Sequence, residues 1–187
     1  MMQAEINKAL QILKKGGIIL FPTDTEWVIG CDASNQTAVN KILTLNKSKN
    51  TNHFVCLVPD ERMLKKYVKQ IPSTALNILE ITDQPTTIIY DEAQNLTLSL
   101  IANDGSIAIR IPDNDFCYWL TRKLNGTIAT ITTSTDKQKP LKSFKEITPA
   151  ILKGVDYVVN LHHEKTFSKP PSIIKLSNNG IVKIIRE

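Results

Sequence analysis

Hydroxyl and carboxylate side chains follow a short apolar segment near the N-terminus of this 187-residue chain. The apolar residues 18–21 predict a buried strand, and Pro22 ends the pattern. Thr23, Asp24 and Thr25 come next, and open α/β sheets bind their ligands beyond the ends of strands. These three residues are therefore candidate ligand contacts. The alternative is a turn in which Thr and Asp side chains bond to the backbone of the loop itself.

The histidines and cysteines lack the spacing of metal ligands. His162 and His163 are adjacent, and neighbouring residues on a strand point to opposite faces, so we expect structural or exposed side chains. Cys31, Cys56 and Cys117 are far apart, lie in apolar runs and form no Cys-x-x-Cys pair. They are predicted to be buried, reduced thiols. No protein-bound metal is expected.

Apolar periodicity predicts the elements that must position these residues. Apolar residues at helical spacing predict helices at 6–13, 36–45, 63–68, 76–79 and 116–124. Short apolar runs predict strands at 18–21, 54–58, 86–90, 106–111, 128–131, 155–161, 172–176 and 181–185. Asn178-Asn179-Gly180 predicts a hairpin between the last two strands. Residues 46–53 and 135–145 are polar and are expected to form loops.

The order of these elements predicts the fold class. Helices alternate with strands in the first half, and strands cluster at the end. This order favours an α/β fold in which helices pack on a mixed sheet, rather than a purely parallel sheet. The length is that of one domain, here residues 1–187. The glycine-rich fingerprint and the lysine motif of the common nucleotide-binding folds are both absent from the sequence.

Composition limits the possible partners only loosely. The formal net charge of +5 is compatible with phosphate-bearing partners, and equally with a charged surface that keeps the protein soluble. The first residues are charged and amphipathic, so they are not read as a signal peptide. No apolar run approaches the length that a bilayer requires. We therefore expect a cytoplasmic protein with no membrane partner.

Five segments resemble motifs of the YrdC/YciO family, and they occur in the family's order. Residues 22–30 resemble Pro-Thr-[Asp/Glu]-Thr-x-Tyr-Gly-Leu-Gly, and residues 84–89 resemble Gly-Pro-x-Thr-x-Ile-Leu. Residues 107–113 resemble Val-Gly-Val-Arg-x-Pro-Asp, while 171–176 and 182–186 resemble Pro-Ser-Thr-Val-Val-Asp-Leu and a terminal Ile-Leu-Arg. The resemblance implies a YrdC-like domain, in which a twisted mixed sheet with flanking helices surrounds a basic cleft.

The resemblance also implies an activity. Threonylcarbamoyl-AMP synthases of this family combine ATP, threonine and bicarbonate into threonylcarbamoyl-adenylate and pyrophosphate, for threonylcarbamoyl modification of tRNA. The chain would then be a nucleotidyltransferase with ATP as its ligand and Mg²⁺ arriving with the ATP. Such a site needs cations, hydroxyls and backbone donors that hold a triphosphate close to a carboxylate.

The family's binding residues can be transferred one by one to matching positions. By resemblance, Arg110 would face the threonine carboxylate, to which a planar guanidinium is suited, from a partly exposed place in the cleft. Without the resemblance, a surface ion pair with Asp113 is equally open. The other substrate-binding candidates are Thr23, Thr25, Trp27 and Ser172. The nucleotide-binding candidates are Lys47, Lys49, Thr87, Thr132, Ser134 and Arg186.

Two family motifs are degenerate in this sequence. Where the family has Lys-x-Arg-Pro, residues 46–49 read Asn-Lys-Ser-Lys, and where it has Thr-Ser-Ala-Asn, residues 131–134 read Ile-Thr-Thr-Ser. These departures are closer to the YciO-like branch of the family. The first hypothesis is a threonylcarbamoyl-AMP synthase-like enzyme with a nucleotide- and RNA-binding cleft. The alternative is a catalytically impaired paralogue that binds double-stranded RNA or tRNA through phosphate contacts.

Overall fold

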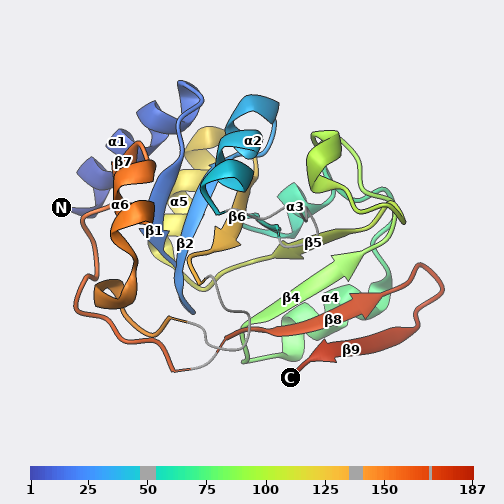
Figure 1. Ribbon diagram of the computed structural model, residues 1–187. Helices are drawn as coiled ribbons and strands as arrows, with labels where there is room; N and C mark the ends of the chain where they lie inside the picture. Colours follow the sequence, from blue (N-terminus) through green and yellow to red (C-terminus); the bar gives the residue numbers. More distant parts are fainter. Residues whose placement is uncertain (47–53, 135–140, 169) are drawn as a thin grey trace.

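The computed structural model describes residues 1–46, 54–134, 141–168 and 170–187. In this part of the chain, nine strands form one twisted mixed sheet in the order β7-β1-β2-β6-β3-β5-β4-β8-β9 (Figure 1). The strands are β1 (Ile19–Pro22), β2 (Trp27–Asp32), β3 (Val55–Leu57), β4 (Thr86–Tyr90), β5 (Ile107–Arg110), β6 (Ile128–Thr132), β7 (Tyr157–Val158), β8 (Ser172–Leu176) and β9 (Val182–Arg186). The helices are α1 (Met2–Lys14), α2 (Gln36–Leu45), α3 (Glu61–Leu64), α4 (Ser73–Ile81), α5 (Asp115–Leu124) and α6 (Pro149–Gly154), with the 3-10 turns η2 (Leu98–Leu100) and η3 (Phe144–Glu146).

Side chains alternate between the two faces of the sheet, and each face carries its own apolar layer. On β2, Val28 belongs to the apolar cluster that contains residues of α1 and α5, whereas Ile29 belongs to the cluster that contains residues of α2. Helices α1 and α5 therefore cover one face of the sheet around β1, β2 and β6, and α2 covers the other (Figure 1). The predicted mixed sheet with flanking helices is confirmed.

Strand β5 and helix α5 position Arg110, a buried cation. Strand β5 runs parallel to β3 and antiparallel to β4, and it ends at Arg110. The chain then reaches Asn114, which caps α5 because its side-chain oxygen accepts a hydrogen bond of 2.9 Å from the amide of Cys117. The cap starts α5 a few residues after β5, so the first turn of the helix lies close to Arg110.

The hairpin between β1 and β2 is the main difference from the predicted elements. Residues 23–25 were predicted to lie beyond the end of a strand. Residues 23–26 instead form the turn of a hairpin, because β2 follows them directly and pairs antiparallel with β1. The amide of Thr23 donates to the carbonyl of Glu26 at 2.9 Å and closes the turn. Strand β2 was not predicted because helices cover both of its faces, so its residues are apolar without alternation.

The C-terminal strands agree with the sequence except at β7. The hairpin predicted at Asn178-Asn179-Gly180 joins β8 to β9, and Gly180 has a φ of 82°, which glycine adopts easily. Residues 155–161 were predicted as a strand, but only Tyr157 and Val158 pair with β1. The strand ends there because the amide of Asn160 bonds to the carboxylate of Glu5 instead of to a neighbouring strand.

Glu5 is a buried carboxylate that fastens α1 to the end of β7. Its Oε2 accepts hydrogen bonds from the hydroxyl of Tyr157 at 2.5 Å and from the amide of Asn160 at 2.8 Å, and Lys8 lies 3.6 Å from Oε1. Burial opposes ionisation of Glu5, but these partners outweigh it, so the pKa of Glu5 is lower than its usual 4.5. The same contact contributes, with burial as the larger cause, to raising the pKa of Tyr157 to about 12.

Replacing Glu5 with glutamine is expected to lower the free energy of unfolding by about 1–3 kcal/mol near neutral pH, because a buried bond to a charged acceptor is lost. Since the folded pKa is depressed, this stabilisation is present above the usual pKa of 4.5 and is lost as the pH falls through the folded pKa. Urea unfolding of the two proteins at several pH values measures the effect. A difference that stays constant down to acidic pH would contradict this assignment.

Candidate anion-binding site

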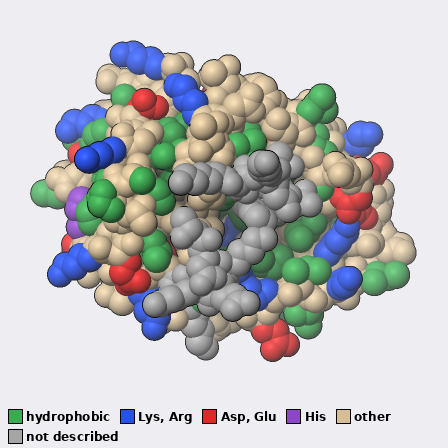
Figure 2. Space-filling model, viewed as in Figure 1, with side chains coloured by type: hydrophobic (Ala, Val, Ile, Leu, Met, Phe, Trp, Pro, Cys, Tyr) green, Lys and Arg blue, Asp and Glu red, His purple; other side chains and the backbone are tan. Residues whose placement is uncertain are grey.

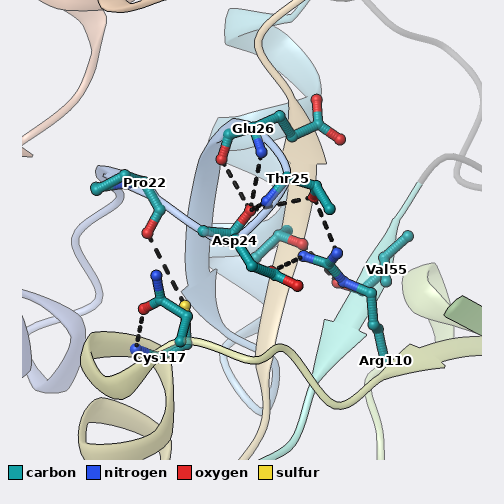
Figure 3. A network of polar contacts seen from close by, with 10 residues as sticks. Pro22, Asp24, Thr25, Glu26, Val55, Arg110 and Cys117 are labelled. Carbon is teal, nitrogen blue, oxygen red and sulfur yellow. Dashed lines mark hydrogen bonds and ion pairs between the residues drawn. The ribbon is translucent and has the colours of Figure 1, made fainter. Parts of the chain in front are cut away.

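Arg110 lies with its guanidinium buried against the turn between β1 and β2 (Figure 3). Its Nη2 is 2.9 Å from Oδ1 of Asp24, and its Nη1 donates a hydrogen bond of 2.9 Å to Oγ1 of Thr25. Only 4% of Arg110 is exposed. The prediction of a partly exposed arginine is therefore wrong, because a carboxylate and a hydroxyl take the place of water around it. The alternative partner Asp113 is exposed, and the ion pair is made with Asp24.

Thr23 organises the turn from within. Its Oγ1 donates to the carbonyl of Glu26 at 2.8 Å and accepts from the amides of Thr25 at 3.2 Å and Glu26 at 3.1 Å. This is the local side-chain-to-backbone bonding that was the alternative interpretation for these residues. The hydroxyl of Thr23 thus holds the backbone of the turn, while Thr25 and Asp24 direct their oxygens at Arg110 (Figure 3).

The end of β6 is tied to the same turn. Oγ1 of Thr132 donates a hydrogen bond of 2.6 Å to Oε2 of Glu26, and it accepts one of 3.2 Å from the amide of Ser134. Both Ser134 and Thr133 are buried. Thr132 and Ser134, predicted to bind nucleotide, therefore lie in one polar network with Thr23, Thr25 and Arg110.

Cys117 lies beside this network on the first turn of α5. Its Sγ approaches the carbonyl of Pro22 at 4.0 Å (Figure 3). Burial raises the pKa of the Cys117 thiol well above its usual range, more strongly than the nearby charge of Arg110 lowers it. Cys117 is therefore a neutral packing residue, as are the buried Cys31 and Cys56, and the prediction of buried thiols is confirmed.

A second group of predicted residues lies at the start of β4 and β8. Oγ of Ser172 is 3.1 Å from Oγ1 of Thr86, and it donates to the carbonyl of Pro85 at 3.3 Å. Thr87 is buried on the neighbouring position of β4. Strands β5, β4, β8 and β9 are consecutive in the sheet, and the register sets Ser172 opposite Thr86 and Ile173 opposite Thr87. Thr87 and Ser172 therefore lie close together but point to opposite faces of the sheet.

Arg186 ends β9, the last strand of this row. Its Nε and Nη2 donate to the carbonyl of Pro171 at 3.0 and 2.6 Å, next to Ser172. Arg186 pairs across the hairpin with Ile173 and is exposed, so its guanidinium keeps access to solvent. The structure thus places Arg186 near the second group, next to Ser172.

A groove of about 990 Å³ opens between the two groups and is lined by both Asp24 and Thr86. Its carboxylates are Asp24, Asp60, Glu61, Asp83 and Asp113, and its cations are Arg62 and Arg122. Arg122 is already paired with Asp60 at 3.2 Å. The described lining is thus richer in carboxylates than in cations. Lys47 and Lys49, predicted to bind nucleotide, lie outside the described residues.

Trp27, predicted to contact substrate, is packed in the interior and is 2% exposed. Its ring centroid lies 4.8 Å from that of Phe144 and 5.3 Å from that of His163, and the latter two rings stack at 4.0 Å. The Nε1 of Trp27 is buried, and no atom of the described residues accepts a hydrogen bond from it. His163 is thus a packing residue and His162 is exposed, in line with the structural role predicted for both.

Glu26 and Thr86 contribute to the networks but were not among the predicted site residues, and Asp24 was predicted as a ligand contact rather than as the partner of Arg110. Asp24 and Glu26 alternate with the threonines of the turn, and this alternation of acids and hydroxyls was a usable signal. Thr86 is adjacent to Thr87 and faces Ser172 across a parallel strand pair. Only the strand register, which the sequence does not contain, shows that Thr86 and not Thr87 meets Ser172.

Within the ranges 1–46, 54–134, 141–168 and 170–187, His, Cys, Asp and Glu form no group of three or more that could hold a metal ion. In the same ranges, no helix is long and apolar enough to cross a membrane.

On the face drawn in Figure 2, Lys and Arg side chains lie around the rim with Asp and Glu side chains among them.

The mixed sheet and the buried arginine beside a hydroxyl-rich turn define an α/β protein with a candidate site for an anion. The sequence model of the family Sua5_yciO_yrdC, described as "Telomere recombination", matches residues 11–187. The chain therefore belongs to the Sua5/YciO/YrdC family. A protein of Methanocaldococcus jannaschii named "Putative threonylcarbamoyl-AMP synthase" is 31% identical over 97% of this chain and 87% of its own length.

Solved structures show the same fold. The E. coli YciO structure matches with a TM-score of 0.84 and 22% identity, over 100% of this chain and 90% of that one. The structure of P. abyssi Sua5 complexed with L-threonine matches with a TM-score of 0.81 and 16% identity, over 91% of this chain and 50% of that one. The predicted family and fold are thereby confirmed.

Proposed function

We propose that this protein is a threonylcarbamoyl-AMP synthase-like enzyme that joins threonine, bicarbonate and ATP for modification of tRNA. The observation that carries the proposal is the buried Arg110, which bonds to Thr25 and is paired with the groove-lining Asp24. A relative of 31% identity bears the name of this activity, and a structural neighbour was solved with L-threonine. The cytoplasm is the compartment that this role requires.

Arg110 is the group that would receive the carboxylate of threonine. A guanidinium binds a carboxylate through two parallel N–H···O bonds, and burial strengthens such bonds because water does not compete. The hydroxyl of Thr25 is within hydrogen-bond distance of the same guanidinium and could contact the bound amino acid next to it. Ser172, which lies 3.1 Å from the groove-lining Thr86, would also contact threonine.

The nucleotide would contact Thr132, Ser134 and Thr87. Its phosphates would bind Arg186, Lys47 and Lys49. The hydroxyl of Thr132 donates to Glu26 and the amide of Ser134 donates to Thr132, so these donors would exchange those partners for phosphate oxygens when a nucleotide binds. Mg²⁺ would arrive with the triphosphate and offset its charge, as in other phosphoryl-transfer sites. The protein would not need to supply side-chain ligands to Mg²⁺, since Mg²⁺ is commonly held by substrate phosphates and water.

Pyrophosphate release measures this function directly. The protein is incubated with ATP, Mg²⁺, L-threonine and bicarbonate, and pyrophosphate is followed with each component omitted in turn. We expect release that requires both threonine and bicarbonate. If no pyrophosphate forms while tRNA binds with an affinity that falls steeply as salt rises, the chain is instead the impaired RNA-binding paralogue. Its net charge of +5 and residues 46–49 are the features that favour that outcome.

A further inference from the structure

The terminal nitrogens of Arg110 are already bound by the protein's own oxygens. Nη2 is 2.9 Å from the carboxylate of Asp24, and Nη1 is 2.9 Å from the hydroxyl of Thr25. Among the residues that the structure describes, Asp24 is the carboxylate paired with this arginine. Any ligand carboxylate that binds Arg110 must therefore share the guanidinium with Asp24 or displace it.

Sharing is unfavourable in this place. Two carboxylates on one guanidinium would lie within a few ångströms of each other, and like charges repel strongly where water is excluded. The side chain of Asp24 is 12% exposed and that of Arg110 is 4% exposed, so solvent screens the pair only weakly. Displacement of Asp24 is therefore the favoured route by which a carboxylate reaches Arg110.

The groove gives the side chain of Asp24 space to rotate, and hydrogen bonds hold the backbone of the turn in place. Asp24 lines the groove of about 990 Å³, so a rotation of its side chain would move the carboxylate towards water. The backbone of the turn is held by the three bonds of Thr23 to Thr25 and Glu26. The side chain can therefore change rotamer while Thr25 stays beside Arg110.

We propose that Asp24 is an internal substitute for the ligand's carboxylate, which holds Arg110 in the free protein and gives way when a carboxylate ligand binds. Asp24 then sets the affinity of the site, because each ligand must compete with it. It also keeps Arg110 neutralised and oriented between turnovers. The identity of the ligand as threonine rests on the proposed function, whereas the exchange of carboxylates does not.

The variant Asp24→Asn tests this exchange because it keeps the shape of the side chain and removes its charge. L-threonine and acetate are titrated calorimetrically into the wild-type protein, Asp24→Asn and the control Asp113→Asn. Asp113 also lines the groove but is not paired with Arg110. We expect Asp24→Asn to bind both carboxylates at least tenfold more tightly than the wild-type protein and the control do.

Thermal unfolding gives a second readout that does not depend on a fully stable variant. Acetate, compared with chloride at equal ionic strength, should raise the melting temperature of Asp24→Asn and leave that of the wild-type protein nearly unchanged. Unchanged or weaker carboxylate binding by Asp24→Asn, with threonine still bound by the wild-type protein, overturns the exchange and leaves the proposed function standing. If Asp24→Asn binds acetate more tightly but neither protein binds threonine, the exchange is supported and the proposed function is contradicted.

Discussion

Replacing Arg110 with methionine is expected to lower the free energy of unfolding by up to about 3–5 kcal/mol, which is the cost of a buried carboxylate without its counter-ion, and by less to the extent that Asp24 turns towards the groove. Thr25 also loses the donor of its hydrogen bond. Urea unfolding of the purified variant measures the loss. A partly exposed Arg110, as predicted from the sequence, would cost far less to remove.

Two further variants test the origin of that loss. Arg122→Met removes an exposed arginine that pairs with Asp60, and it should cost no more than about 1 kcal/mol. The double variant Arg110→Met with Asp24→Leu should recover most of the stability, because hydrophobic residues often replace a buried ion pair at little cost. A double variant that is no more stable than Arg110→Met would mean that the loss does not arise from the unpaired carboxylate.

Replacing Trp27 with alanine is expected to lower the free energy of unfolding by about 3–5 kcal/mol, because a large buried side chain is removed from the core. The stacked rings of Phe144 and His163 lose their neighbour in the same step. Chemical denaturation followed by circular dichroism measures the change.

Trp27→Phe is the matched variant, since it keeps an aromatic ring and removes the unpartnered Nε1. The cavity left by the smaller ring is offset in part by the loss of a buried donor without an acceptor, so we expect a cost below about 1.5 kcal/mol. Threonine affinity should be the same in Trp27→Phe and in the wild-type protein. A large loss of affinity with little loss of stability would instead support the prediction that Trp27 contacts substrate.

Much of the fold could be predicted from the sequence because burial leaves a periodic pattern. Helix α2 (Gln36–Leu45) and strand β8 (Ser172–Leu176) lie where apolar spacing placed them. Strand β2 was not predicted because both of its faces are buried. Its apolar residues do not alternate with polar ones, so the sequence pattern does not identify it as a strand. The sheet order, which joins β6 to both β2 and β3, also rests on long-range pairing that no local pattern reports.

The site was predictable as a set of residue types but not as a set of contacts. Thr25, Thr132 and Arg110 were identified by their resemblance to family motifs, and they do belong to one polar network. The pairing of Arg110 with Asp24 was not predicted, because it depends on how a hairpin turn meets the end of a distant strand. Burial of the guanidinium follows from that pairing and was therefore missed as well.

Calorimetric titration of L-threonine at fixed pH and salt tests the central claim, that Arg110 binds the carboxylate of the substrate. The wild-type protein is compared with Arg110→Lys, which keeps the charge beside Asp24 but lacks the planar fork, and with Arg122→Lys as control. We predict that Arg110→Lys binds threonine at least tenfold more weakly, in line with the roughly 1.5–3 kcal/mol of a bond to a charged group, and that Arg122→Lys equals the wild type. Equal affinity in Arg110→Lys and the wild-type protein, or no binding of threonine by the wild-type protein, would contradict the claim.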